Sequence, residues 1–215
     1  MKKNTRVLRE ILHRVYDQGQ YFMSQKDVAK ACKVSLDTVH RVVTKLAQFR
    51  GVEKRPFGFR VVDPKKCLMY WAATRNLAAD VVYTTYSPDS PTEIEQDMPE
   101  DTVFTAFSGF VRRFGGGPTD YEEIYVYARA DEVMRRYPES GALKTNIYVL
   151  RPDPHLIQLS PQGAPPLAQL YVDLWQIGGS TADRFLLQLE QRLEAKPVEA
   201  FKRLIKREEE WSGLG

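Results

Sequence analysis

A run of polar and basic side chains between residues 35 and 45 has the residue types and spacing that suit contact with double-stranded DNA. Hydroxyl, imidazole and cationic groups hydrogen-bond to base edges and phosphate oxygens when a helix lies in the major groove. These residues occupy the positions that the apolar residues of the same segment leave free. The candidates are Ser35 at the point of entry, Thr38, His40 and Arg41 for base contacts, and Thr44 and Lys45 for phosphate contacts.

A helix over residues 35–48 must position these side chains. Its apolar residues recur at the spacing of one buried stripe, which leaves the polar residues on the opposite face. Ser35 can cap this helix, because its hydroxyl can accept a hydrogen bond from an unpaired backbone amide of the first turn. A shorter support helix is predicted after a second cap, Ser24, and the turn at Lys33 and Val34 separates the two helices. The buried stripes are Val28, Ala29 and Cys32 in the first helix and Val39, Val42, Val43 and Leu46 in the second.

A β-hairpin is predicted directly after this helix, which Gly51 can end. Its strands cover residues 52–55 and 59–62, and residues 56–58 form its turn. Cations on such a hairpin contact phosphates that flank the bound groove, and so add affinity without sequence information. The cations of the hairpin are Lys54, Arg55 and Arg60.

The division of charge along the chain supports a nucleic-acid-binding first domain. A predicted opening helix over residues 5–17 completes a winged helix-turn-helix domain of residues 1–63. Residues 1–75 carry 17 lysine and arginine residues against 6 aspartate and glutamate residues, a net charge of +11. The remaining residues carry 14 against 22, a net charge of −8. A basic head on an acidic body is typical of a DNA-binding domain attached to a second domain.

Residues 64–215 are predicted to form that second domain, a mixed α+β body. Apolar residues at every second position indicate strands, and apolar residues spaced three or four positions apart indicate helices. Glycine and proline residues mark where these segments end. From about residue 165 the chain is expected to be helical. The expected strands cover residues 81–86, 124–129, 146–150 and 156–159, and the expected helices cover residues 102–114, 131–137, 166–177, 182–194 and 198–211.

Residues 165–190, PPLAQLYVDLWQIGGSTADRFLLQLE, resemble the C-terminal signature of AbiEi-type antitoxins and related transcriptional regulators. In that family a Gln-Leu-Tyr-Val-Asp-Leu stretch followed by Gly-Gly opens the last helices; here these are residues 169–174, Gly178 and Gly179. The order of parts matches along essentially the whole chain, although the middle matches only as a pattern of elements. The resemblance implies a winged helix followed by a nucleotidyltransferase-like domain.

The resemblance also implies a function: a DNA-binding repressor, often one that regulates its own operon. Some members of the family neutralise a partner nucleotidyltransferase toxin, so a protein toxin is a second expected partner. A homodimer stays open, because two-fold pairing matches palindromic sites while a single winged helix can also bind alone. Asp173, within the signature, is interpreted as part of a local cap or salt bridge, since one carboxylate without a positioned partner is not a catalytic site.

A weak or degenerate nucleotidyltransferase is the main enzymatic alternative. Its chemistry needs a Gly-Ser turn for the triphosphate and two carboxylates on one strand for Mg²⁺. Here Ser108 and Gly109 stand in reversed order, and Asp120 and Glu122 lie two residues apart before an apolar strand. We interpret these acids as a solvated loop and predict no catalysis, and a vestigial metal site at Asp120 and Glu122 stays open.

Two further alternatives concern the second domain. Aromatic side chains could line an effector-binding pocket, although aromatic residues on helix and strand faces are more often part of a core. The acidic body could instead present a surface to a basic protein partner. The aromatic residues are Tyr83, Phe104, Phe107, Phe110, Tyr125 and Tyr127.

Several classes of protein are excluded by the composition. No apolar run approaches the roughly 18 residues needed to span a bilayer, and no signal peptide is evident at the N-terminus, so a cytoplasmic protein without a membrane partner is expected. The two cysteines, Cys32 and Cys67, form no CxxC pair, and the histidines are scattered at His13, His40 and His155. The sequence therefore predicts no metal, no cofactor and no redox role.

Overall fold

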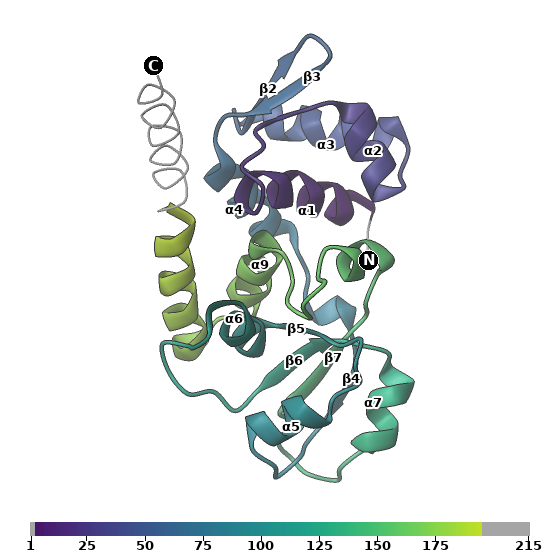
Figure 1. Cartoon of the computed structure of the whole chain (residues 1–215), viewed down its shortest axis with the longest axis vertical. Helices are drawn as coiled ribbons and strands as arrows, with labels where there is room; N and C mark the ends of the chain where they lie inside the picture. The colour runs from purple at the N-terminus through teal and green to yellow at the C-terminus, as the bar shows by residue number, and fades with distance from the viewer. Residues whose placement is uncertain (1–2, 195–215) are drawn as a thin grey trace, which may run out of the picture.

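The computed structural model describes residues 3–194, which form an α+β fold (Figure 1). It has two small sheets, one of three antiparallel strands and one of four strands in mixed orientation. No helix within these residues is both long and apolar enough to cross a membrane. The helix predicted over residues 198–211 lies outside the described residues.

Residues 3–62, which we call the N-terminal unit, contain three helices and the smaller sheet. Strand β3 pairs with both β1 and β2, so that a short strand between the first two helices joins the hairpin in one sheet. The hairpin projects at the upper end of the molecule in Figure 1. The elements are α1 (Lys3–Tyr16), β1 (Phe22–Met23), α2 (Gln25–Cys32), α3 (Leu36–Gln48), β2 (Val52–Arg55) and β3 (Gly58–Val61).

The predicted starts of α2 and α3 are confirmed by their caps. The Ser24 hydroxyl accepts a hydrogen bond from the backbone amide of Asp27 at 3.0 Å, and the Ser35 hydroxyl accepts one from the amide of Thr38 at 3.3 Å. Lys33, between α2 and α3, adopts a left-handed conformation that ends α2. The hairpin is confirmed as well, whereas β1 has no counterpart among the predicted elements because two residues are too few to show alternation.

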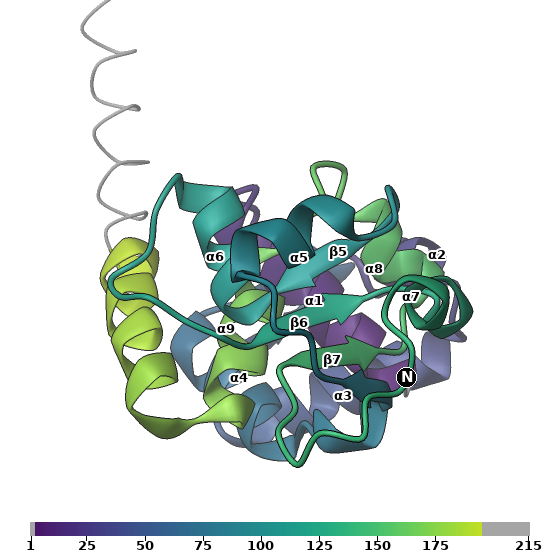
Figure 2. The ribbon, with the colours of Figure 1, turned by 90° about the horizontal axis from the view of Figure 1, so that it is seen from below.

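The second sheet lies in the body of the molecule, residues 63–194, and its strands follow the order β4-β7-β6-β5. Only β6 and β7 are parallel. Helices α5 and α7 cover one face of the sheet, and α6 and α9 lie on the other, as Figure 2 shows from below. The elements are α4 (Pro64–Thr74), a 3₁₀ turn (Ala78–Asp80), β4 (Val81–Thr85), α5 (Pro91–Asp97), β5 (Val103–Thr105), α6 (Ala106–Phe114), β6 (Ile124–Tyr127), α7 (Ala130–Arg136), β7 (Ile147–Leu150), α8 (Pro154–Gln158), α9 (Leu167–Ile177) and a helix over residues 179–194.

One prediction for the body is wrong in part and another is wrong. The helix expected over residues 102–114 begins as strand β5 and turns sharply into α6 at Ala106, whose φ is +51°. The strand expected over residues 156–159 is instead α8, because Asp153 caps a helix there by accepting from two backbone amides and Pro154 occupies the first helical position. Helix α5, capped by Ser90, has no counterpart among the predicted elements.

The N-terminal unit and the body share one cluster of buried apolar side chains. Helix α1 lies against α2 and α3 on one side and against α4 and α9 on the other. Buried residues of this cluster include Val7 and Ile11 of α1, Trp71 of α4 and Leu170 of α9. The predicted boundary after residue 63 coincides with the start of α4, and the burial of α1 fixes α3 to the body.

Candidate nucleic-acid interface

The predicted recognition residues lie on α3, whose two faces differ sharply in burial. Val39, Val43 and Leu46 are fully buried, and the side chains that alternate with them point to solvent. Most of the candidate residues are therefore accessible to a large ligand. Ser35, His40, Arg41 and Lys45 are exposed, and Thr44 is partly exposed.

Thr38 is the exception among the candidates, because its side chain is only 4% exposed. Its hydroxyl lies 2.9 Å from the hydroxyl of Ser35, and its amide is the one that Ser35 caps. The expected base contact of Thr38 is therefore replaced by a role in shaping the first turn of α3. The sequence pattern placed it wrongly because a residue three positions after a cap points back toward that cap.

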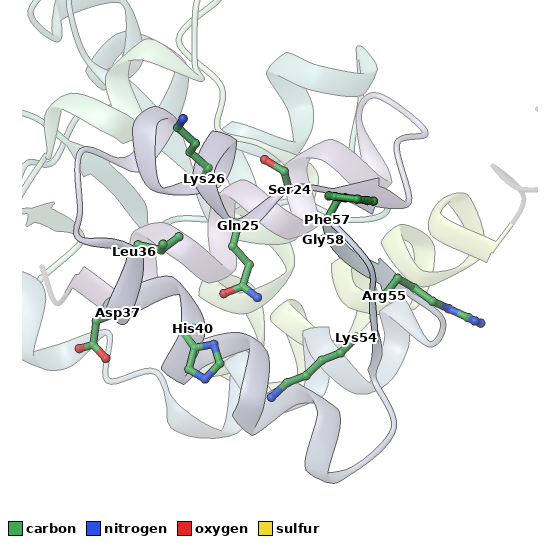
Figure 3. Close-up of a pocket in the computed structure, with 10 residues that line it drawn as sticks. All are labelled: Ser24, Gln25, Lys26, Leu36, Asp37, His40, Lys54, Arg55, Phe57 and Gly58. Carbon is green, nitrogen blue, oxygen red and sulfur yellow. The ribbon is translucent and has the colours of Figure 1, made fainter.

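A groove of about 730 Å³ separates the first turn of α2, the exposed face of α3 and the hairpin (Figure 3). In Figure 3 the side chains of His40 and Lys54 extend toward the same space, and Arg55 points away from it. Gln25 and Lys26 also line the groove and are not among the predicted contact residues. Their position in the first turn of α2, directly after the cap Ser24, is the sequence feature that could have indicated them. The lining residues are Ser24, Gln25, Lys26, Leu36, Asp37, His40, Lys54, Arg55, Phe57 and Gly58.

A chain of polar contacts joins α3 to the hairpin. The Lys54 ammonium donates to the Thr44 hydroxyl at 3.0 Å, and that hydroxyl lies 3.4 Å from Nε2 of His40. These contacts connect the hairpin to α3, so three of the candidate residues, His40, Thr44 and Lys54, lie on one surface.

Two arginines of this surface lie in exposed ion pairs. Arg41 lies 3.2 Å from Asp37, one helical turn earlier, and both side chains are about two-thirds exposed. Arg55 similarly pairs with Glu53 on the hairpin, and Arg60 is exposed on β3. Exposed pairs of this kind contribute little free energy. A phosphate or a guanine can therefore replace the carboxylate at small cost.

A second group of polar residues is buried where α1 meets the body. The Arg9 side chain, which is 0% exposed, donates to Gln169 at 2.8 Å and to a carboxylate oxygen of Asp153 at 3.0 Å. Burial lowers the pKa of Arg9 from its usual value, and the charge of Asp153 opposes that shift. These contacts connect α1 to α8 and α9.

Asp173 is the acceptor at the centre of the same buried group. It accepts from Arg75 at 3.1 Å, from Thr105 at 2.9 Å, from Tyr127 at 2.7 Å and from Gln169 at 2.8 Å. Burial disfavours the charge of Arg75, but its neighbours, among them Asp173 and Asp80, raise its pKa above the usual value. Asp173 is thus in a salt bridge, as expected, and its carboxylate accepts from one residue each of β5, β6 and α9 and from Arg75 directly after α4.

Three potential metal ligands also come together within residues 3–194: Glu10, Cys32 and His155 offer atoms within 4.8 Å of one another. The guanidinium of Arg9 lies 3.2 Å from Nδ1 of His155 and can only donate, so Nδ1 must accept. The ring proton then lies on Nε2, 2.9 Å from Glu10. That proton occupies the nitrogen that faces Glu10 and Cys32, and moving it to Nδ1 would turn an N–H toward the Arg9 guanidinium, which is also a donor. Burial raises the pKa of the Cys32 thiol to about 12.

This group is therefore better suited to hydrogen bonding than to metal coordination. Sequence spacing gave no sign of it, because Glu10 and His155 are 145 positions apart.

The residues of the degenerate nucleotidyltransferase pattern do not converge. Ser108 and Gly109 lie inside α6, where a Cβ at Gly109 would meet the carbonyl oxygen of Phe104 at 2.5 Å. This glycine serves close packing of α6 on β5. Asp120 and Glu122 are exposed in the irregular segment before β6. No phosphate-binding turn thus faces these two acids in the described part of the chain.

The six aromatic residues considered for an effector pocket belong to separate parts of the core. Tyr83 and Phe104 lie in the cluster under α5 and α7, while Phe107, Phe110 and Tyr125 lie in the cluster shared with α9. Tyr127 belongs to a third cluster and is fully buried. The sheet separates the first two clusters, so these rings do not line one cavity.

The fold and this site define an α+β protein with a basic, solvent-exposed helix and hairpin at one end. Comparison of the chain with protein-family models, curated proteins and solved structures found no match.

Proposed function

We propose that the chain is a sequence-specific DNA-binding transcriptional regulator that acts as a repressor, and that its N-terminal unit is a winged helix-turn-helix domain. The observation that carries the proposal is the groove between α3 and the hairpin, which has cationic and polar side chains on both sides. A helix with one buried and one polar face, beside a basic hairpin, fits the major groove and its flanking phosphates.

In this proposal α3 enters the major groove from its N-terminal end at Ser35. His40 and Arg41 contact base edges, and Thr44 and Lys45 contact phosphates. The hairpin, through Lys54, Arg55 and Arg60, contacts the adjacent backbone. Repression follows from occupancy, because a bound protein blocks access of the transcription machinery to the same DNA.

The alternative is an antitoxin that neutralises a partner nucleotidyltransferase toxin and binds DNA to regulate itself. Two observations favour it: the resemblance of residues 165–190 to AbiEi-type antitoxins, and the net charge of −8 after residue 75, which suits a basic partner. In either case we propose that residues 64–215 form a nucleotidyltransferase-like domain without transfer activity.

The test is a titration of purified protein against labelled DNA from upstream of its own gene and against random DNA of equal length, at two salt concentrations. We expect tighter binding to the upstream DNA, with a preference that persists at the higher salt. Lys45→Ala should weaken binding, and Lys144→Ala, which removes an exposed lysine of the body, should not. Binding without preference that disappears at the higher salt would contradict the proposal.

A further inference from the structure

The tip of the hairpin carries a large apolar side chain with almost no protein around it. Phe57 is 95% exposed, between Pro56 and Gly58 in the turn that joins β2 to β3. Isolated apolar residues on a surface are common. A fully exposed aromatic ring at the tip of a projecting hairpin, however, is not buried on folding and so adds no hydrophobic free energy to the folded state.

The backbone conformation at position 57 is also unfavourable for phenylalanine. Its φ of +66° lies in the left-handed region, where the Cβ of a residue such as phenylalanine is crowded. Glycine or asparagine would adopt this conformation more easily. The chain thus accepts both an exposed ring and a strained backbone at one position, and strain of this kind is concentrated at functional sites.

The neighbouring residue shows what the fold itself requires of this turn. A Cβ at Gly58 would lie 2.3 Å from the carbonyl oxygen of Met23, so the close approach of β1 excludes any larger residue there. Phe57 points out of the turn and has no such constraint. The hairpin therefore needs glycine at position 58 but does not need phenylalanine at position 57.

The surroundings of the ring indicate what it contacts. Phe57 lines the same groove as His40, Lys54 and Arg55, so an apolar ring projects from a cationic surface. An apolar group beside cations complements a nucleic-acid groove, where charged phosphates flank stacked bases. The two grooves of B-DNA alternate across the phosphate backbone. A hairpin held beside α3 by the contact of Lys54 with Thr44 would therefore face the minor groove next to the major groove that α3 occupies.

We propose that Phe57 is a wedge that enters the minor groove beside the α3 site, packs against the sugars and partly separates two base pairs, which bends the DNA. This inference rests on the proposed DNA-binding function and adds a specific contact to it. Such a contact selects sequence through deformability, because pyrimidine–purine steps unstack most easily.

The experiment uses the full chain and the upstream duplex with a donor dye and an acceptor dye at its two ends, so that bending raises energy transfer. Phe57→Gly should weaken binding about tenfold or more and abolish the bend. The slope of binding against salt concentration should stay unchanged, because no charge is removed. Thermal stability should stay equal or rise, since glycine relieves the left-handed backbone.

Two further variants serve as controls. Phe57→Trp keeps a flat apolar ring and should keep both affinity and bend, and its indole fluorescence should change on binding. Leu143→Ala removes an apolar side chain that is equally exposed on the body and should change neither.

Equal affinity and equal bending for wild type and Phe57→Gly would overturn the wedge and leave the DNA-binding proposal intact. Failure of the wild type to prefer its upstream DNA would instead overturn the proposed function, and the wedge with it. If Phe57→Gly loses structure by circular dichroism, Phe57→Asn replaces it, because asparagine also tolerates the left-handed region.

Discussion

Arginine side chains lie in opposite environments in two regions of this molecule. On α3 and the hairpin, Arg41 and Arg55 are exposed and pair with exposed carboxylates. At the junction of α1 with the body, Arg9 and Arg75 are buried and are surrounded by acceptors, including Asp153 and Asp173. Composition alone cannot distinguish the two groups, since the residue types are the same.

The difference shows how burial decides the role of a charge. An exposed pair is weak, so its arginine is available to a ligand. A buried pair is costly to desolvate but still more costly to break, because removing one partner leaves an uncompensated charge. The exposed region is thus suited to exchange partners, and the buried region is suited to hold α1, and with it α3, in one orientation.

The largest expected effect comes from breaking the buried region. Asp173→Ala leaves four donors without their acceptor and should lower the free energy of unfolding by about 3–5 kcal/mol. Chemical denaturation monitored by circular dichroism measures the change. Asp131→Ala, which removes an exposed carboxylate that pairs with Arg129, is the matched control and should lower the free energy of unfolding far less than Asp173→Ala does. Equal effects of the two variants would remove the distinction between the regions.

The next effect tests the exposed region through binding. Arg41→Ala should weaken binding to the upstream DNA by about 1–3 kcal/mol and relax the preference at one base position, if the guanidinium contacts a guanine. The variant should unfold like the wild type, because the Arg41 pair is exposed. Competition between single-base variants of the duplex gives the measurement. Equal losses on cognate and random DNA would make Arg41 a phosphate contact.

The buried region should also make the stability of the protein depend on pH, through Glu10. Burial disfavours the charge of Glu10, but hydrogen bonds from His155 and Arg14 outweigh it, so the pKa of Glu10 is lowered in the folded state. A lowered folded pKa gives stability that is present above the unfolded value, near 4.5, and is lost as the pH falls through the folded value.

Denaturation between pH 6 and pH 3 should therefore show falling stability in the wild type and a shallower fall in Glu10→Gln. The groups that face Glu10 are His155, Arg14 and Cys32. Parallel profiles for wild type and variant would exclude Glu10 as the source of the dependence.

The exposed region was largely predictable from sequence, because its signals are local. The caps Ser24 and Ser35, the apolar stripe of α3 and the Pro-Phe-Gly turn are each read within a few neighbouring residues. The one misplaced candidate, Thr38, lies where the chain turns back on its own cap, which a face pattern does not resolve.

The buried region was not predictable in the same way. Its contacts join residues far apart in the chain, such as Arg9 with Gln169 and Arg75 with Asp173, and a single sequence carries no signal of such pairing. The two wrong elements have a related cause. The φ of +51° at Ala106 and the Asp153 cap are decided by backbone geometry that apolar periodicity does not report.

A smaller effect on binding is expected from the hairpin. Lys54→Ala should weaken all DNA sequences alike and reduce the slope of log affinity against log salt by about 1, because one phosphate contact is lost. Loss of its hydrogen bond to Thr44 should cost little stability at this exposed position. Titrations at four salt concentrations give the slope. A loss confined to the upstream sequence would assign Lys54 to base contact instead.

The smallest effect on stability is expected at Asp120 and Glu122, two exposed acids that lack, within residues 3–194, the hydrogen-bond donors that surround Asp173. Asp120→Ala combined with Glu122→Ala should change the free energy of unfolding by no more than about 0.5 kcal/mol for each substitution, because both side chains lie in an exposed irregular segment. The double variant should also leave DNA binding unchanged.

The same variant tests for catalysis. In an assay with labelled nucleoside triphosphate, Mg²⁺ and RNA or protein acceptors, neither the wild type nor the double variant should transfer label, since Ser108 and Gly109 lie within α6 and form no phosphate-binding turn. If the wild type transfers label and the double variant does not, Asp120 and Glu122 form a working metal site. Exposed charges in this protein would then include catalytic groups as well as groups that only exchange ion-pair partners, and exposure alone would not tell the two apart.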